Sequence, residues 1–143
     1  MEEFAELARR ALQTFTTKNV SAVLALFAED AIMIDPHYPE PEMRGKASIQ
    51  RGLLWAFGNI ETSEFTILRT WSEASQPYGV IEADTHHVFH GGIKLHFAQV
   101  FIVEYQANLI YRLQSFPSHG PPGLPGLSTG ITRLWWRLSG KIK

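Results

Sequence analysis

A single carboxylate, Asp35, stands where an apolar run ends and a proline begins. The run Ala31–Ile34 has the length and composition of a short buried strand, and Pro36 cannot continue the hydrogen bonding of a strand. The rigid end of such an element can hold a carboxylate against a cavity, where it takes or gives a proton as a general base or acid. We therefore predict that Asp35 is a catalytic base. The alternative is an acid that only caps the proline-rich loop 37–43.

A second group of ionisable side chains lies along a predicted hairpin. The pair Gly91-Gly92 is a tight-turn signal between two strands. A two-residue turn places His86 opposite Phe97, and directly opposite residues share one face of a sheet. The face predicted in this way carries Glu82, Asp84, His86, Leu95, Phe97, Gln99 and Phe101. A three-residue turn would instead shift the register and break this assignment.

The predicted face suits a cavity wall on which a few polar groups converge among apolar ones. An imidazole paired with a carboxylate can move protons near neutral pH, so we predict catalytic roles for His86, Asp84 and Gln99, the last as a donor to a carbonyl group. The alternatives are a solvated strand face and a core glutamine paired with Asp84. A metal site built from Glu82, Asp84 and His86 is not expected, because ligands along one strand spread too far to converge.

The remaining wall of the cavity is assigned to aromatic residues and a few polar ones. Trp55, Phe57 and Trp71 fit either a core or a cavity lining, and His37 fits the rim because it follows Asp35 in a loop. The full set predicted to bind substrate is His37, Trp55, Phe57, Trp71, Glu82, Phe97, Phe101 and Tyr111. No metal and no cofactor are expected.

The other face of the predicted hairpin is also apolar, along Ala98, Val100 and Ile102. A sheet with two apolar faces must be covered twice. Helices can cover one face, and a second copy of the chain is the simplest cover for the other, so we expect a homodimer. His87, His90 and His96 are then expected at the surface or the interface.

Hydrophobic periodicity predicts helices first and strands afterwards. Apolar residues recur at helical spacing over 4–15, Asn19 can cap a second helix that runs to Phe27, and a third helix is expected over 46–57. Runs rich in β-branched and aromatic residues then predict strands over 62–72, 78–90, 93–105 and 109–116. This order indicates an α+β fold with a mostly antiparallel sheet.

Composition excludes several classes of protein and site. The 143 residues carry a formal net charge of -1, which argues against a general nucleic-acid binder, and no cysteine, which excludes zinc–thiolate sites. The start of the chain is acidic and lacks the apolar run of a signal peptide, and no stretch is long and apolar enough to span a membrane. We expect a cytoplasmic protein.

The C-terminal segment 118–143 differs from the domain expected over 1–117. It carries four basic residues and no acidic one. Glycine and proline predict a linker over 118–130. A short helix should follow, with an apolar stripe flanked by bases. Such a helix suits packing on the domain, docking on a partner, or an anionic membrane surface. The stripe is Ile131, Leu134, Trp135, Leu138 and Ile142, and the flanking bases are Arg133, Arg137 and Lys141.

Residues 3–117 resemble the NTF2-like superfamily, and within it the SnoaL-like polyketide cyclases and ketosteroid isomerases. The resemblance rests on the segments 27–31, 35–36, 44–49 and 109–113 in this order and spacing. It implies three helices packed into a curved sheet that forms a cone.

The same resemblance assigns Asp35 to the catalytic base. Gln99 stands where ketosteroid isomerases carry an aspartic acid that donates to the oxyanion, and Ala11 stands where they carry a tyrosine. A steroid isomerase is therefore not expected. The sequence favours a cofactor-independent isomerase, cyclase or dehydratase acting on a small, largely apolar carbonyl compound. A non-catalytic ligand-binding or dimerisation module and a membrane-associated adaptor are the alternatives.

Overall fold

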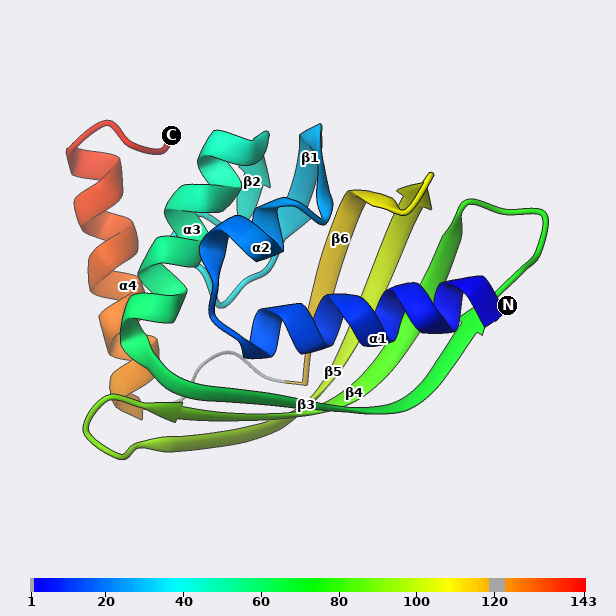
Figure 1. Ribbon diagram of the computed structural model, residues 1–143. Coiled ribbons are helices and arrows are strands. Elements are labelled where there is room, and N and C mark those ends of the chain that lie inside the picture. The colour runs from blue at the N-terminus through cyan, green and yellow to red at the C-terminus, as the bar shows by residue number, and fades with distance from the viewer. Residues whose placement is uncertain (1, 119–122) are drawn as a thin grey trace.

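The computed structural model describes residues 2–118 and 123–143 and contains a six-stranded sheet in the order β2-β1-β6-β5-β4-β3 (Figure 1). All neighbouring strands are antiparallel except β1 and β6, which are parallel. The elements are α1 (Glu2–Thr16), α2 (Val20–Leu24), β1 (Phe27–Ile34), β2 (Glu42–Arg44), α3 (Lys46–Asn59), β3 (Ile60–Ser72), β4 (Tyr78–Phe89), β5 (Lys94–Gln106), β6 (Leu109–Pro117) and α4 (Gly123–Leu138).

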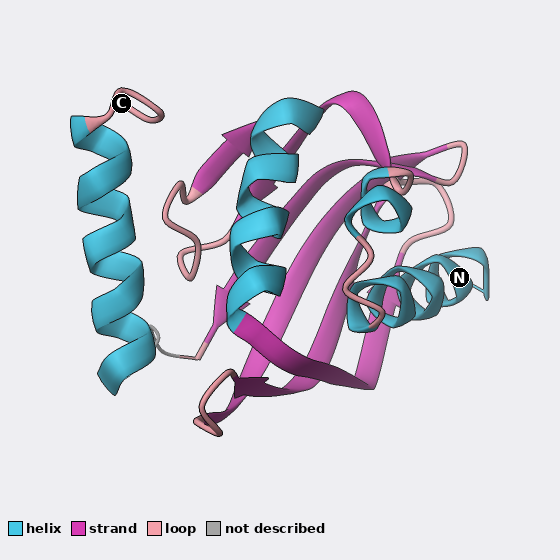
Figure 2. Cartoon of the chain, turned by 60° about the vertical axis from the view of Figure 1, so that its left-hand side comes forward, coloured by secondary structure: helices cyan, strands magenta, loops and turns pink. Residues whose placement is uncertain are grey.

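The sheet curves, is not closed, and holds α1, α2 and α3 in its concave side (Figure 2). Helix α1 buries its apolar stripe against the sheet, including Phe4, Leu7 and Leu12. Helix α2 begins at its predicted cap, because the Asn19 side chain accepts a hydrogen bond from the amide of Ala22. It ends earlier than expected, and Phe27 begins β1 instead of completing the helix.

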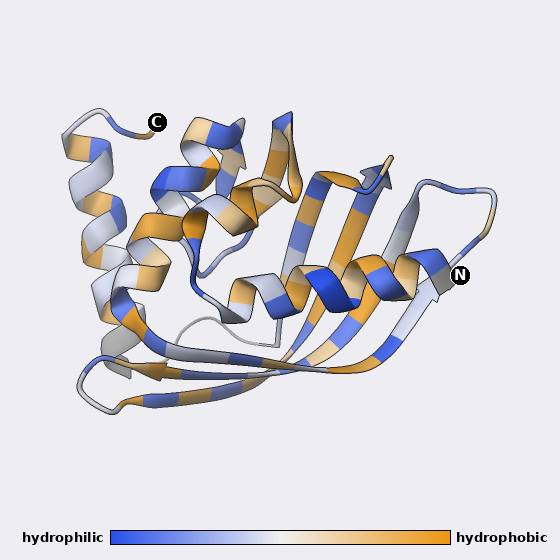
Figure 3. Ribbon diagram, in the orientation of Figure 1, coloured by the Kyte–Doolittle hydropathy of each residue, from blue (hydrophilic) through white to orange (hydrophobic). Residues whose placement is uncertain are grey.

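The α+β fold and the curved, mostly antiparallel sheet predicted from the sequence are confirmed. Hydrophilic and hydrophobic residues alternate along β4 and β5, as expected for strands with one face in the core (Figure 3). Every strand lies within two residues of its predicted start, apart from β1, which starts four residues earlier, and β2, which was expected to be loop.

The predicted register of the β4–β5 hairpin is wrong by one residue. The amide of Phe89 donates to the carbonyl of Ile93 at 2.8 Å, so the loop contains His90, Gly91 and Gly92. The amide of His90 donates instead to the carbonyl of Asn59, at the end of α3, 3.1 Å away. This contact between distant segments removes His90 from the ladder, and therefore the loop has three residues.

Because of the shifted register, each side chain of β4 lies on the face of the sheet opposite to the predicted one, while the side chains of β5 keep their predicted face. His86 pairs with His96 and Asp84 with Ala98, while Thr85 pairs with Phe97. Because side chains alternate along a strand, Asp84 and His86 leave the concave face and Thr85 enters it.

The C-terminal segment is more helical than its composition predicts. Helix α4 begins at Gly123, so the linker predicted over 118–130 is wrong from that residue onward, and residues 119–122 lie outside the described part. The Arg133 guanidinium donates to the carbonyls of Pro36, Tyr38 and Pro39 and so fixes α4 beside the loop after β1. Over the described residues, no helix is long and apolar enough to cross a membrane.

Candidate active-site cavity

The concave face of the sheet and the helices enclose a cavity of about 320 Å³. Most of its wall is apolar, with Leu7 from α1, Trp55 from α3, and Phe97 and Phe101 from β5. Thr129 of α4 borders it on the side of the C-terminal helix. An apolar cavity with a few polar groups is the usual form of a small-molecule site.

Asp35 lies in this cavity, as predicted, directly after β1. The residue is 6% exposed, and its Oδ1 accepts a hydrogen bond from the amide of His37 at 2.8 Å. Its own amide donates to the carbonyl of Pro41 at 2.8 Å, which holds the residue against the loop. Burial raises the pKa of the Asp35 carboxyl, while the His37 amide, the His37 imidazole and the Ser115 hydroxyl act in the opposite direction. The carboxyl is therefore held in place and kept more basic than an exposed aspartate.

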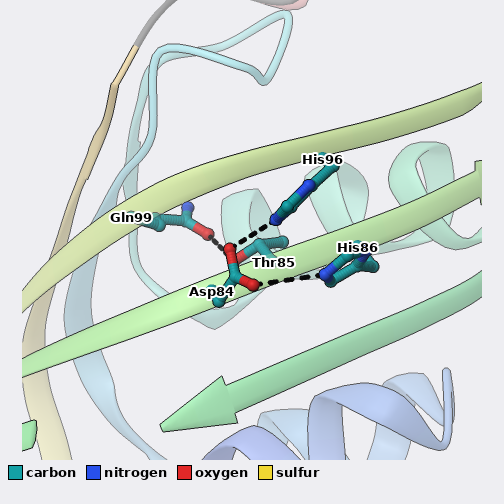
Figure 4. A network of polar contacts seen from close by, with 5 residues as sticks. All are labelled: Asp84, Thr85, His86, His96 and Gln99. Atoms are coloured by element: carbon teal, nitrogen blue, oxygen red, sulfur yellow. Dashed lines mark hydrogen bonds and ion pairs between the residues drawn. The ribbon is translucent and has the colours of Figure 1, made fainter. Parts of the chain in front are cut away.

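A chain of buried polar side chains joins Asp35 to the middle of the sheet. The hydroxyl of Thr85 donates to Oε1 of Gln99 at 2.8 Å, and Nε2 of Gln99 donates to Oγ of Ser115 at 2.5 Å (Figure 4 shows the first contact). Ser115 in turn hydrogen-bonds to Asp35. All of these side chains are buried, so the chain is held rigidly. Gln99 is paired with Thr85 and Ser115, and the alternative pairing with Asp84 is wrong.

His87 is a cavity residue that the sequence interpretation missed. Its ring lies 5.7 Å from the rings of both Phe65 and Phe97, measured between centroids. Burial lowers the pKa of His87 to about 4, and the neighbouring His37 contributes in the same direction. Nδ1 of His87 is buried without a hydrogen-bond partner among the described residues. The alternative three-residue turn between the two strands would have placed His87 on the concave face.

Tyr38 is a second missed residue. Its side chain is buried, lines the cavity and packs near Trp55, with 6.2 Å between ring centroids. Burial raises the pKa of its hydroxyl, and the nearby charge of Asp35 raises it further. The hydroxyl therefore keeps its proton and can donate a hydrogen bond. The sequence showed no phenol at the position of Ala11, but the loop after β1 supplies one.

The structure brings together only part of the predicted set. The predicted residues that line the cavity are Asp35, His37, Trp55, Phe57, Phe97, Gln99 and Phe101. Asp84 and His86 lie on the outer face because of the register shift, and so does Glu82, whose carboxylate pairs with Arg69 at 2.6 Å. Trp71 and Tyr111 are exposed and do not line the cavity, since Trp71 lies under the Arg69 guanidinium and Tyr111 points out from β6.

Comparisons with known proteins agree with the fold. The profile of the SnoaL-like domain matches residues 8–113. No curated protein sequence matches the chain.

Among solved structures, PrhC from Penicillium brasilianum is 15% identical with a TM-score of 0.73, and the match covers 98% of this chain and 93% of that one. A protein with a ketosteroid isomerase-like fold from Catenulispora acidiphila, solved with trimethylamine, is 20% identical with a TM-score of 0.68, covering 78% and 84%. A candidate polyketide cyclase from Xanthomonas campestris pv. campestris is 16% identical with a TM-score of 0.68, covering 78% and 87%. At these sequence identities the structural similarity shows a shared fold alone.

Proposed function

The chain belongs to the SnoaL-like domain family, and from this premise we propose that it is a cofactor-independent acid–base enzyme acting on a small, largely apolar carbonyl compound. One observation carries the proposal: Asp35 is a buried carboxyl of raised pKa at the wall of an apolar cavity, fixed by hydrogen bonds from His37 and Ser115. A positioned base in an apolar site is what proton abstraction next to a carbonyl requires.

The proposed reaction starts with transfer of a proton from the carbon next to the carbonyl group to a carboxylate oxygen of Asp35. The electron pair of the broken C–H bond moves into the carbonyl, and the resulting enolate oxygen needs a donor. Tyr38 lines the same cavity, and its hydroxyl keeps its proton. We assign this role to Tyr38.

The enolate can then react in either of two ways. Return of the proton from Asp35 to another carbon gives an isomerase. Attack of the enolate carbon on a second carbonyl of the same substrate, with the proton passing to the new alkoxide, gives a cyclase. Gln99 acts in both cases as a positioning residue, because its amide holds the Ser115 hydroxyl that hydrogen-bonds to the base.

Hydrogen–deuterium exchange tests the proposal without knowledge of the natural product. Cyclic and linear diketones are incubated with the protein in D₂O, and loss of the proton signal next to the carbonyl is followed by NMR. We expect exchange in the wild type and a decrease of about 10²–10⁴-fold in Asp35→Asn. Asp30→Asn, which changes an exposed acid on the same strand, is the matched control.

The competing function is a binding module that holds an apolar molecule without chemistry. The apolar wall of the cavity favours it. In that case diketones or related apolar compounds should bind equally to the wild type and Asp35→Asn, and neither protein should accelerate exchange. That outcome would refute the enzymatic proposal.

We also propose that the protein forms a homodimer through the outer face of the sheet. Ala98 is exposed and Val100 and Ile102 are half-buried on this face of β5, and Phe116 of β6, which pairs with Val100, is exposed there. Exposed apolar groups on neighbouring strands form a continuous patch, and patches of this kind mark contact surfaces.

A peripheral membrane contact through α4 is proposed on a separate observation. The helix turns Arg133 and Trp136 toward the domain and exposes the apolar stripe Leu127, Ile131, Leu134, Trp135 and Leu138. The segment 118–143 is basic and has no acidic residue, so an anionic lipid surface complements it.

Flotation with vesicles of phosphatidylcholine and phosphatidylserine tests the membrane contact. The wild type should float with the vesicles, Leu134→Glu should not, and Thr132→Glu on the flank of the helix should retain most binding. Equal flotation of the two variants would exclude the stripe as the contact.

A further inference from the structure

Three metal-ligating side chains converge on the outer face of the β4–β5 hairpin, away from the cavity. Nε2 of His96 lies 2.6 Å from Oδ1 of Asp84, and Nε2 of His86 lies 3.3 Å from Oδ2 of the same carboxylate (Figure 4). The three ligand atoms all lie within 4.8 Å of one another. We propose that Asp84, His86 and His96 form a binding site for a divalent transition-metal ion of the Zn²⁺ type.

The register of the hairpin is what creates this convergence. His86 and His96 are directly opposite each other on neighbouring strands, and their rings stack with 3.9 Å between centroids. Asp84 is two residues from His86 on the same face and lies opposite Ala98. Ligands along one strand would spread apart, but the neighbouring strand supplies the ligand that closes the triangle.

The distances suit a tetrahedral ion after a small adjustment. Zn–N and Zn–O bonds of about 2.0–2.2 Å place two ligand atoms about 3.3–3.5 Å apart on such an ion. Nε2 of His86 already lies at this distance from Oδ2 of Asp84, whereas Nε2 of His96 contacts the other oxygen, Oδ1, and must move away from it by less than an ångström. The ligand nitrogens of the two histidines lie within 4.8 Å of each other. Side-chain exposures of 48% for His86, 35% for Asp84 and 59% for His96 allow both the movement and the entry of the ion.

The donor set defines which ion should bind. Two imidazoles and one carboxylate favour Zn²⁺, Ni²⁺ or Cu²⁺ over Mg²⁺ and Ca²⁺, which prefer oxygen ligands. Three protein ligands leave at least one coordination position open to water or to another group. Glu64 shares this face and lies opposite His86 on β3, which adds negative charge near the ion.

The site is independent of the proposed acid–base chemistry. Thr85 of β4 and Gln99 of β5 are buried on the concave face, whereas Asp84 and His86 of β4 and His96 of β5 lie on the outer face. A bound ion would link β4 to β5 across the outer face, next to the patch proposed for the dimer. Its direct effect is therefore on the stability of the hairpin, and Asp35 retains its surroundings.

Isothermal titration calorimetry of the tag-free protein with ZnCl₂ tests the inference. We expect one ion per chain, no heat of binding with MgCl₂, and at least about tenfold weaker Zn²⁺ binding in each of Asp84→Asn, His86→Ala and His96→Ala. His90→Ala, which removes an exposed imidazole from the hairpin loop, should bind like the wild type. Zn²⁺ at a hundredfold excess over Kd should raise Tm by about 5–10 °C.

Two results would overturn the site. One is Zn²⁺ binding that survives the loss of both His86 and His96, which would place the ion elsewhere. The other is absence of binding by a wild type whose circular dichroism shows that it is folded. The three residues would then be an aspartate with two histidine hydrogen bonds and nothing more.

Discussion

The placement of His87 in the cavity leads to a pH dependence of stability that can be calculated. Burial lowers its pKa from 6.5 to about 4, and the nearby charge of His37 contributes in the same direction, while a backbone hydrogen bond with His86 acts against it. The unfolded chain therefore binds a proton that the folded protein rejects between these two pH values. The stabilisation is fully present above pH 6.5 and is lost as the pH falls toward 4.

The magnitude follows from the two pKa values. One pH unit of separation corresponds to about 1.4 kcal/mol, so the interval from 6.5 to about 4 gives a loss of about 3 kcal/mol on acidification. His87→Gln removes the titrating group and keeps a polar side chain of similar size. The difference in free energy of unfolding between wild type and variant should change by about 3 kcal/mol between pH 7 and pH 4, with the wild type losing stability.

Urea unfolding followed by tryptophan fluorescence at several pH values measures this difference. EDTA is present throughout, so that no metal ion at His86 disturbs its neighbour. His90→Gln, which alters an exposed histidine three residues further along the chain, should follow the wild type at every pH. Parallel curves for the wild type and His87→Gln, or an NMR titration of His87 near pH 6.5, would refute the burial of this ring in the cavity.

Three further changes test other parts of the structure. Asp35→Asn should make the protein more stable than the wild type at pH 8 in thermal unfolding. The raised pKa of the Asp35 carboxyl in the folded protein means that its ionisation above pH 3.8 costs stability. The gain in the variant should therefore vanish below pH 4. Gln99→Leu removes the acceptor of the buried Thr85 hydroxyl and the donor to Oγ of Ser115, and it should cost about 2–5 kcal/mol in urea unfolding. Val100→Glu should convert a dimer into monomers in light scattering, and a wild type that is already monomeric at micromolar concentration would contradict the dimer.

Helices α1 and α3, the start of α2 and strands β3 to β6 were predictable because each follows from local periodicity. The stripe of α1 is buried along its whole length, and Asn19 caps α2 as its side chain allows. Asp35 was also predictable, since a proline after an apolar run marks a strand end wherever the strand packs. These features depend on residues that are close in the sequence, and they can therefore be predicted from the sequence alone.

The parts that were mispredicted depend on contacts between distant segments. The hydrogen bond from His90 to Asn59 sets the hairpin loop, and nothing near Gly91 in the sequence shows it. Both glycines of the turn have positive φ, as a two-residue turn would also require. Likewise, Arg133 fixes α4 on carbonyls of the loop after β1, while local composition indicated a linker.

The single-residue shift has opposite consequences for the two strands of the hairpin. Strand β5 keeps its predicted faces, so Phe97, Gln99 and Phe101 line the cavity, whereas β4 exchanges His86 for His87. The polar residues of β4 therefore divide between two sites. Thr85 supports Gln99 on the inside, and the residues on either side of it, Asp84 and His86, meet His96 on the outside. Because successive side chains point to opposite faces, a change at His96 can alter metal binding without touching the hydrogen-bonded chain that ends at Asp35.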